Sequence, residues 1–222
     1  MYSRHLDGFT VLIWEQQAHN LYMRIHLVRH GETAPNPPNS FYGGSEVPLS
    51  ANGELQAAAA ATYLADEPVD HIICSPLSRA VFGAEEIRMR HTKAVVSQIA
   101  GFREKDCGHW VGHDLASMKK AYPEDMKSYL ADPINWRGHG GESLAQVQRR
   151  VVSAFENVLT LGYSNIVIVS HLFPTRIILN HLTKGDVVDD LLNMDIPTAS
   201  VSHLDCQADG SIDVGICGHV PY

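Results

Sequence analysis

The chain is poor in cysteine, with four in 222 residues and no C-x-x-C pair among them. Their spacing supplies no set of zinc ligands, so we expect free thiols and a reducing, cytoplasmic compartment. Long apolar runs are lacking as well. The stretch from Thr10 to Trp14 is too short for the apolar core of a signal peptide, and no run is long enough to span a membrane. We therefore expect neither a leader peptide nor a membrane partner.

Positive charge is also scarce, because 17 lysines and arginines face 25 acidic residues and give a formal net charge of −8. Such a surface repels nucleic-acid backbones and anionic membranes, which argues against both as partners. To bind an anionic small molecule, the protein would need a local cluster of arginines. The apolar share of 45% and the charged share of 19% are typical of a globular protein, and the length fits one domain. We expect a monomer or a homodimer.

Alternating strand and helix patterns predict an α/β fold with a doubly wound, mostly parallel sheet and helices on both faces. The expected parallel strands cover residues 23–29, 71–74, 94–99 and 165–170. The expected helices cover residues 50–64, 77–90, 144–158, 174–182 and 186–193. Ser143 and Gln146 form a capping box at the start of one of these helices. Two closing strands, at 200–205 and 211–216, predict an antiparallel edge.

The domain organisation follows from the same patterns. Residues 1–22 show no clean periodicity and are expected to form an N-terminal extension, and residues 23–222 to form one α/β domain. Glycine, proline and tryptophan interrupt the stretch after the third strand, which predicts a small lid insertion at about 105–141. Two short helices are expected within it, near 114–122 and 124–130.

Chemically competent residues follow the ends of four predicted strands. His30 follows the first strand, Arg79 lies just past the second, Glu104 follows the third and His171 follows the fourth. Ligands of a parallel sheet bind outside the carboxyl ends of its strands, so these residues should meet there. Taken singly, each could be an ordinary surface or core residue. Their common placement at one edge of the sheet favours a functional site.

Two arginines, two histidines and a glutamate suit phosphoryl transfer through a phosphohistidine. His30 would attack phosphorus with one ring nitrogen while the other donates to a backbone oxygen. Arg29 and Arg79 would keep this imidazole neutral and bind the non-bridging oxygens. Glu104 would protonate the leaving oxygen and then activate water. Gly31 would leave room for the phosphoryl group. Further donors to the phosphoryl oxygens would be His171 and the amide of Leu172.

A metal site is the alternative for the histidines of the lid insertion. His109 and His113 stand four residues apart, with His139 nearby, and on a helix such a pair could bind zinc. Two glycines in the stretch argue against a rigid helix, and no carboxylate fits an H-E-x-x-H pattern. We therefore expect polar contacts within the lid, no metal and no cofactor. We expect the side chains of Trp110 and Trp136 to form part of the core of the lid.

Six motifs occur in a fixed order: LVRHGET at 27–33, PLS-x-x-G-x-x-QA at 48–57, CSPLSRA at 74–80, FRE at 102–104 with G-x-W-x-G at 108–112, GES at 141–143 and VSH at 169–171. In this order they resemble the histidine phosphatase superfamily, the phosphoglycerate mutase-like proteins, from about Met23 to the C-terminus. The resemblance implies that His30 is phosphorylated and that Glu104 is the proton donor. It also implies a phosphate pocket formed by Arg29, Arg79 and His171.

The resemblance extends to substrate contacts, with two departures. It implies contacts with the phosphoryl group or the substrate from Asn36, Tyr42 and Gly43. Many relatives have an arginine four residues after the asparagine, where this chain has Ser40. A small residue commonly follows the second histidine, where this chain has Leu172-Phe173. We expect Phe173 to narrow the pocket, so the substrate of another family member cannot be assigned to this chain.

The short stretch between Glu104 and His171 bears on the reaction. Cofactor-dependent phosphoglycerate mutases resemble this chain but carry a longer insertion with an arginine pair for the substrate carboxylate. Here the lid has Arg137, and Arg149-Arg150 are expected to face away on the capped helix. A small lid favours release of the phosphoryl group to water. The sequence thus predicts a metal-independent phosphatase for a small phosphorylated metabolite; a phosphoglycerate mutase and a non-catalytic phospholigand-binding protein are the alternatives.

Overall fold

The computed structural model describes residues 22–34 and 40–222. The expected N-terminal extension lies outside these residues except for Tyr22, whose hydroxyl donates a hydrogen bond to Asp205. Asn36 also lies outside them.

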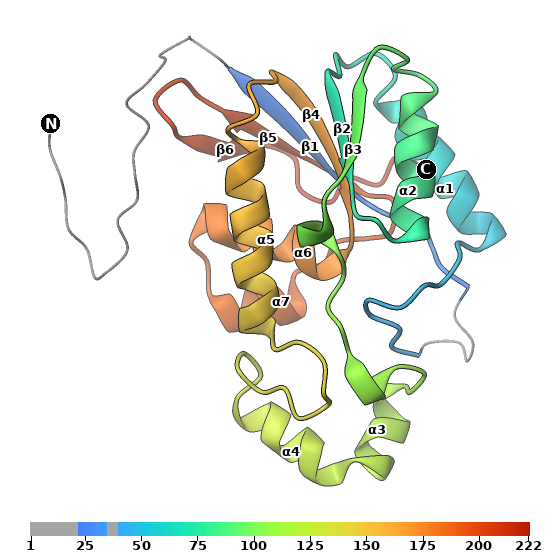
Figure 1. Ribbon diagram of the computed structural model, residues 1–222, viewed down its shortest axis with the longest axis vertical. Coiled ribbons are helices and arrows are strands. Elements are labelled where there is room, and N and C mark those ends of the chain that lie inside the picture. The colour runs from blue at the N-terminus through green and yellow to red at the C-terminus, as the bar shows by residue number, and fades with distance from the viewer. Residues whose placement is uncertain (1–21, 35–39) are drawn as a thin grey trace, which may run out of the picture.

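The sheet has six strands in the order β3-β2-β4-β1-β5-β6 (Figure 1). Four strands are mutually parallel: β1 (Met23–Arg29), β2 (His71–Cys74), β3 (Val95–Gln98) and β4 (Asn165–Ser170). Two strands complete the sheet in antiparallel pairing: β5 (Val201–Cys206) and β6 (Ile212–Val214). The predicted mostly parallel sheet with an antiparallel edge is thereby confirmed.

Helices cover both faces of the sheet (Figure 1). One face packs against α1 (Ala51–Tyr63) and α2 (Ser78–Arg88). The other packs against α5 (Leu144–Val158) and α6 (Leu172–Thr183), with α7 (Val187–Asn193) against α6. Apolar residues of β1 serve both layers, since Ile25 and Leu27 belong to the α5–α6 core and Val28 to the α1–α2 core. This is the doubly wound arrangement that the sequence predicts.

Capping residues explain where the helices begin. Ser50 accepts a hydrogen bond from the amide of Gly53 at the start of α1, and the predicted capping box of Ser143 and Gln146 is present at the start of α5. Helix α6 begins at Leu172, two residues earlier than the predicted range 174–182. Pro174 still fits, because the first amides of a helix have no acceptor within it.

His26 lies in the middle of β1, and its side chain is fully buried. Its Nδ1 lies 2.7 Å from Nδ1 of His203 on β5. This contact satisfies one ring nitrogen of the buried His26, while its Nε2 has no hydrogen-bond partner among the described residues.

The lid insertion lies beyond the carboxyl ends of the parallel strands, at the lower end of the molecule in Figure 1. It holds α3 (Leu115–Ala121) and α4 (Pro123–Ala131), close to the predicted ranges. These helices have an apolar core of their own, formed by Cys107, Trp110, Met118 and Met126. Trp110 stacks on Trp136 with ring centroids 4.8 Å apart, which confirms their assignment to the lid core.

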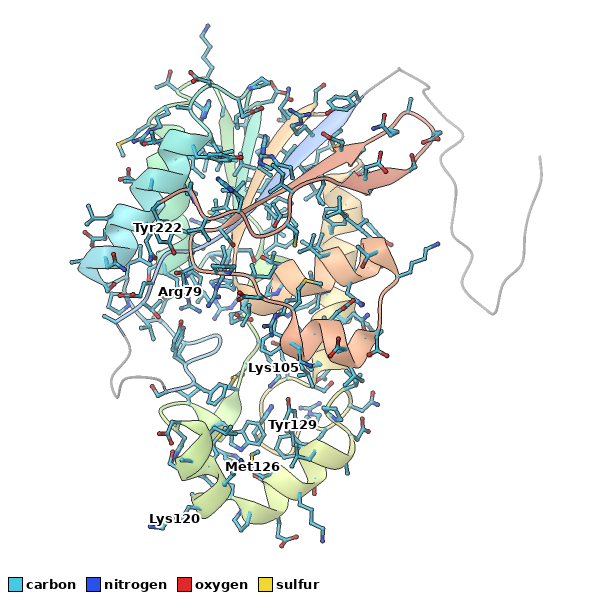
Figure 2. The ribbon with its side chains drawn as sticks, turned by 180° about the vertical axis from the view of Figure 1, so that it is seen from behind. Arg79, Lys105, Lys120, Met126, Tyr129 and Tyr222 are labelled. Carbon is cyan, nitrogen blue, oxygen red and sulfur yellow. The ribbon has the colours of Figure 1, made fainter. Side chains whose placement is uncertain are left out.

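Two of the lid histidines make side-chain polar contacts. His109 pairs with Asp125 at 2.9 Å. The buried His139 lies 2.9 Å from Nζ of Lys105, which joins the lid to the domain (Figure 2). Within residues 22–34 and 40–222, no group of three or more His, Cys, Asp or Glu side chains is placed to hold a metal ion. The four cysteines are free thiols.

No helix in the described part of the chain is long and apolar enough to cross a membrane.

Gly31 lies against the first turn of α1, not against open space. A Cβ atom added at Gly31 would lie 2.1 Å from the carbonyl oxygen of Gly53. The contact is reciprocal, because a Cβ at Gly53 would lie 1.9 Å from the carbonyl oxygen of Glu32. The expectation that Gly31 leaves room for a phosphoryl group is therefore wrong. Both glycines are needed because two backbones meet there.

This contact predicts the effect of Gly53→Ala. Alanine normally favours a helix over glycine, but here its methyl group must displace the backbone of Glu32. We expect a loss of about 1–3 kcal/mol in the free energy of unfolding, as for overpacked sites, and a fall of roughly 2–12 °C in Tm. Differential scanning fluorimetry provides the measurement. The control is Gly83→Ala in α2, where the new methyl meets one side-chain carbon at 3.3 Å. Equal Tm values for the two variants would contradict the interpretation.

Candidate active site

The register of the sheet places the two histidines side by side. Arg29 on β1 is paired with Ser170 on β4, so the next residues, His30 and His171, leave the sheet at the same level. Their ring centroids are 5.0 Å apart. Both side chains are almost fully buried, with exposed fractions of 3% and 0%. The meeting of these residues at the carboxyl edge of the sheet is the arrangement expected from the sequence.

His30 is held as a neutral ring whose Nε2 lone pair points towards Arg79. Its Nδ1 lies 2.7 Å from the carbonyl oxygen of Gly31, which can only accept, so Nδ1 bears the proton. Its Nε2 accepts from Nε of Arg79 at 3.3 Å. Burial, followed by Arg79 and Arg29, holds the pKa of His30 well below its usual range. The ring therefore presents a lone pair on Nε2, as a nucleophile requires.

Arg79 is the most buried cation of the site, with 1% of its surface exposed. Its two terminal nitrogens donate to the carbonyl oxygens of Gly43 and Ser45, each at 2.7 Å. Its guanidinium lies over the ring of Tyr42, 5.1 Å from the centroid. A surface ion pair of Arg79 with Glu85 or Glu86, the ordinary interpretation of such an arginine, is not formed: Arg79 is buried, and these carboxylates pair with Arg88 and Arg90.

Tyr42 and Gly43 thus contact the site through Arg79. The hydroxyl of Tyr42 accepts from Thr33 at 2.7 Å. Gly43 has a φ of 45°, and a Cβ there would lie 2.4 Å from the carbonyl oxygen of Lys105. This glycine lets the 42–45 loop lie against the segment that contains Glu104.

Arg29 approaches the site from the end of β1. Its Nη1 donates to the carbonyl oxygen of Ile196 at 2.5 Å. Its Nε is buried and has no hydrogen-bond partner among the described residues. A buried guanidinium with an unused donor can bind an anion without first breaking an internal bond.

Glu104 lies at the N-terminus of α6. Its Oε2 accepts from the amide of Leu172 at 3.1 Å and from that of Phe173 at 3.5 Å, and its Oε1 accepts from the amide of Lys105. Its exposed fraction is 9%. The Leu172 amide, expected to face a phosphoryl group, is in this structure engaged by the glutamate. Three backbone amides thus hold the Glu104 side chain at the N-terminus of α6.

Arg150 contacts the segment that contains Glu104, which the sequence did not indicate. It was expected to face away with Arg149, and for Arg150 this is wrong. Its guanidinium pairs with Glu142 at 2.7 Å and donates to the carbonyl oxygens of Gly101, Arg103 and Glu104. Arg149 is exposed. Helical periodicity separates apolar from polar faces, but it cannot tell which of two adjacent arginines has carbonyl oxygens within reach.

The two ends of the lid insertion are joined beside Arg150. The amide of Glu142 donates to the carbonyl oxygen of Asp106, and the amide of Asp106 donates to Oε2 of Glu142, each at 3.0 Å. A Cβ at Gly141 would lie 2.3 Å from that Asp106 oxygen. The base of the lid is therefore closed by backbone contacts. Figure 2 shows Lys105 at this junction, between Arg79 in the domain and Met126 and Tyr129 in the lid.

The structure thus brings Arg29, His30, Arg79, Glu104 and His171 to one edge of the sheet. Comparisons with known proteins show the family of the chain. The model of the histidine phosphatase superfamily (branch 1) matches residues 25–214. The chain belongs to the histidine phosphatase superfamily.

Several similar proteins are named phosphatases. The chain is 34% identical to phosphoserine phosphatase 1 of Hydrogenobacter thermophilus, over 69% of this chain and 73% of that protein. It is 30% identical to the uncharacterized phosphatase PhoE of Bacillus subtilis, over 73% of this chain and 78% of that protein. A solved mycobacterial glucosyl-3-phosphoglycerate phosphatase in complex with VO3 has a TM-score of 0.75 at 27% identity, over 89% of this chain and 99% of that one.

The contacts of Arg150 predict that Arg150→Lys lowers activity. Lysine keeps the charge but cannot reach a carboxylate and several carbonyl oxygens at once, so the backbone of Glu104 loses its support. We expect kcat for p-nitrophenyl phosphate to fall about tenfold or more, as when a residue that orients a functional group of a site is removed. Arg149→Lys is the matched control and should be neutral. Equal rates for the two variants would show that Arg150 does not position Glu104.

Proposed function

We propose that the protein is a metal-independent phosphomonoesterase that works through a phosphohistidine on His30. One observation supports this most directly. His30 is a neutral imidazole whose Nδ1 proton is directed to the Gly31 carbonyl and whose Nε2 lone pair faces Arg79. A lone pair next to buried guanidinium groups suits attack on an anionic phosphorus centre.

In the first step, Nε2 of His30 forms a bond to phosphorus while the bond from phosphorus to the leaving oxygen breaks. The phosphoryl group would enter between Arg79 Nε and His30 Nε2, whose hydrogen bond would break. Arg29 and Arg79 would then bind its non-bridging oxygens. Glu104 in its protonated form gives its proton to the leaving oxygen. The products are phosphohistidine, an alcohol and the Glu104 carboxylate.

In the second step, a water molecule replaces the alcohol. The Glu104 carboxylate takes a proton from the water as its oxygen bonds to phosphorus, and the bond from phosphorus to Nε2 breaks. Phosphate leaves, and both His30 and Glu104 return to their starting protonation states. The cycle needs no metal ion.

The substrate class is a small phosphorylated metabolite. The named activity of the Hydrogenobacter relative makes phosphoserine the first compound to test. The lid supports hydrolysis over mutase chemistry, because it has Arg137 but no arginine pair to hold the carboxylate of a phosphoglycerate.

The mechanism predicts that His30→Ala abolishes turnover. Without the imidazole no phosphohistidine can form, although the fold should survive because the side chain bonds only to Gly31 and Arg79. Phosphate release from phosphoserine, sugar phosphates, nucleotides and phosphoglycerates should disappear, and acid-labile phosphate should no longer be trapped on the protein. A fully active His30→Ala protein would contradict the mechanism.

Two controls accompany this experiment. EDTA should leave turnover by the unsubstituted protein unchanged. A strict metal requirement would favour the alternative that the lid histidines bind a metal ion. Isomer formation from phosphoglycerate without phosphate release would favour the mutase. Failure to trap phosphohistidine with any member of the panel would favour a non-catalytic phospholigand-binding protein.

Glu104→Gln should slow both chemical steps, because glutamine can neither give nor take the proton. We expect kcat for phosphoserine to fall by about 10²–10⁴, the range for general acid–base catalysis. With p-nitrophenyl phosphate, whose leaving group needs little protonation, a rapid burst of nitrophenolate should persist before slow turnover. The control is Glu124→Gln on the exposed face of α4. An unchanged kcat for Glu104→Gln would assign the proton transfer elsewhere.

A further inference from the structure

His171 has one engaged and one unengaged ring nitrogen. Its Nε2 lies 2.7 Å from Oγ of Ser75. Its Nδ1 is buried and has no hydrogen-bond partner among the described residues. The ring lies next to His30, with centroids 5.0 Å apart. Nδ1 is therefore the nitrogen that remains available to a group bound at His30.

Ser75 is fixed in place by the sheet. It directly follows β2, its amide donates to the carbonyl oxygen of Val169 on β4 at 3.0 Å, and its side chain is fully buried. The amide of Leu77 donates to Oγ at 3.3 Å, which occupies one lone pair of the hydroxyl. Within the described residues, His171 Nε2 is the only other hydrogen-bond partner of this oxygen. The hydroxyl proton thus has a single acceptor.

The direction of this hydrogen bond sets the tautomer of His171. If Ser75 donates to Nε2, the ring proton is on Nδ1, and only that N–H is left unpaired. If instead Nε2 donates to Ser75, the hydroxyl proton has no acceptor and the Nδ1 lone pair has no donor, so two buried groups are unpaired. Because unpaired buried polar groups are costly, the first arrangement is favoured.

We propose that Ser75 is a positioning residue that holds the ring proton of His171 on Nδ1, from which it donates to the phosphoryl group that His30 attacks. The role in catalysis rests on the proposed function. A phosphoryl group presents only acceptor oxygens, so a neutral ring with a bare Nδ1 would repel it. Burial, followed by His30, Arg79 and Arg29, holds the pKa of His171 well below its usual range. The ring is therefore neutral, and the position of its proton matters.

The tautomer can be read from the ¹⁵N NMR spectrum of the full chain labelled in histidine. The His171 signals are assigned by their loss in His171→Gln. At neutral pH we expect a protonated Nδ1 and an unprotonated Nε2, and added inorganic phosphate should shift the Nδ1 signal more than the Nε2 signal. A proton on Nε2 would overturn the proposal.

Substitution of the serine supplies the second measurement. Ser75→Ala removes the donor that selects the tautomer, so the fraction of rings with the proton on Nδ1 should fall, and kcat/KM for p-nitrophenyl phosphate should fall roughly 10–100-fold, as for partners behind functional histidines. The control is Ser202→Ala, a buried serine of β5 whose Oγ accepts from the amide of Gly218. It should change neither the tautomer nor the rate. An unchanged tautomer and rate in Ser75→Ala would overturn the proposal.

The inference and the proposed function fail in different ways. No turnover of any phosphomonoester by the unsubstituted chain contradicts the proposed function, while the NMR spectrum still reports the tautomer. A proton on Nε2 in an active enzyme contradicts only the role of Ser75. If Ser75→Ala does not fold, the spectrum of the unsubstituted chain decides the question.

Discussion

The parallel pairing of β1 with β4 is the constraint on which the site depends. Because Arg29 is paired with Ser170, the residues after the two strands leave the sheet together, and two histidines far apart in sequence become neighbours. A slip of one residue would turn Ile25 and Leu27 out of the α5–α6 core. Burial of apolar side chains thus fixes the register, and the register fixes the spacing of the histidines.

The cations of the site are bound by backbone carbonyl oxygens. Arg79 donates to Gly43 and Ser45, and Arg29 donates to Ile196. A carbonyl oxygen orients a guanidinium without cancelling its charge, whereas a carboxylate partner would cancel it. Positive charge therefore remains available in a chain whose formal net charge is −8, and it is concentrated where an anion would bind.

The sequence predicts well what depends on periodicity and topology. The strands, the capping box at Ser143 and the common edge of His30, Arg79, Glu104 and His171 all follow from short patterns and from the geometry of parallel sheets. Contacts of a side chain with distant backbone groups leave no such pattern. Arg150 contacts carbonyl oxygens, and Ser75 contacts an imidazole, that belong to segments far away in the chain. The sequence therefore predicts the wrong orientation for Arg150 and does not single out Ser75.

The closed base of the lid insertion has a consequence for how such a protein can diversify. Asp106 and Glu142 join the two ends of the insertion, and Arg150 ties this junction to the backbone of Glu104. The residues between those ends pack around their own small core. Changes confined to α3 and α4 should therefore disturb the glutamate little. Changes at the inner edge of the lid would not be neutral, because Gly112 and His113 exchange backbone hydrogen bonds with Phe41, next to the loop whose carbonyl oxygens orient Arg79.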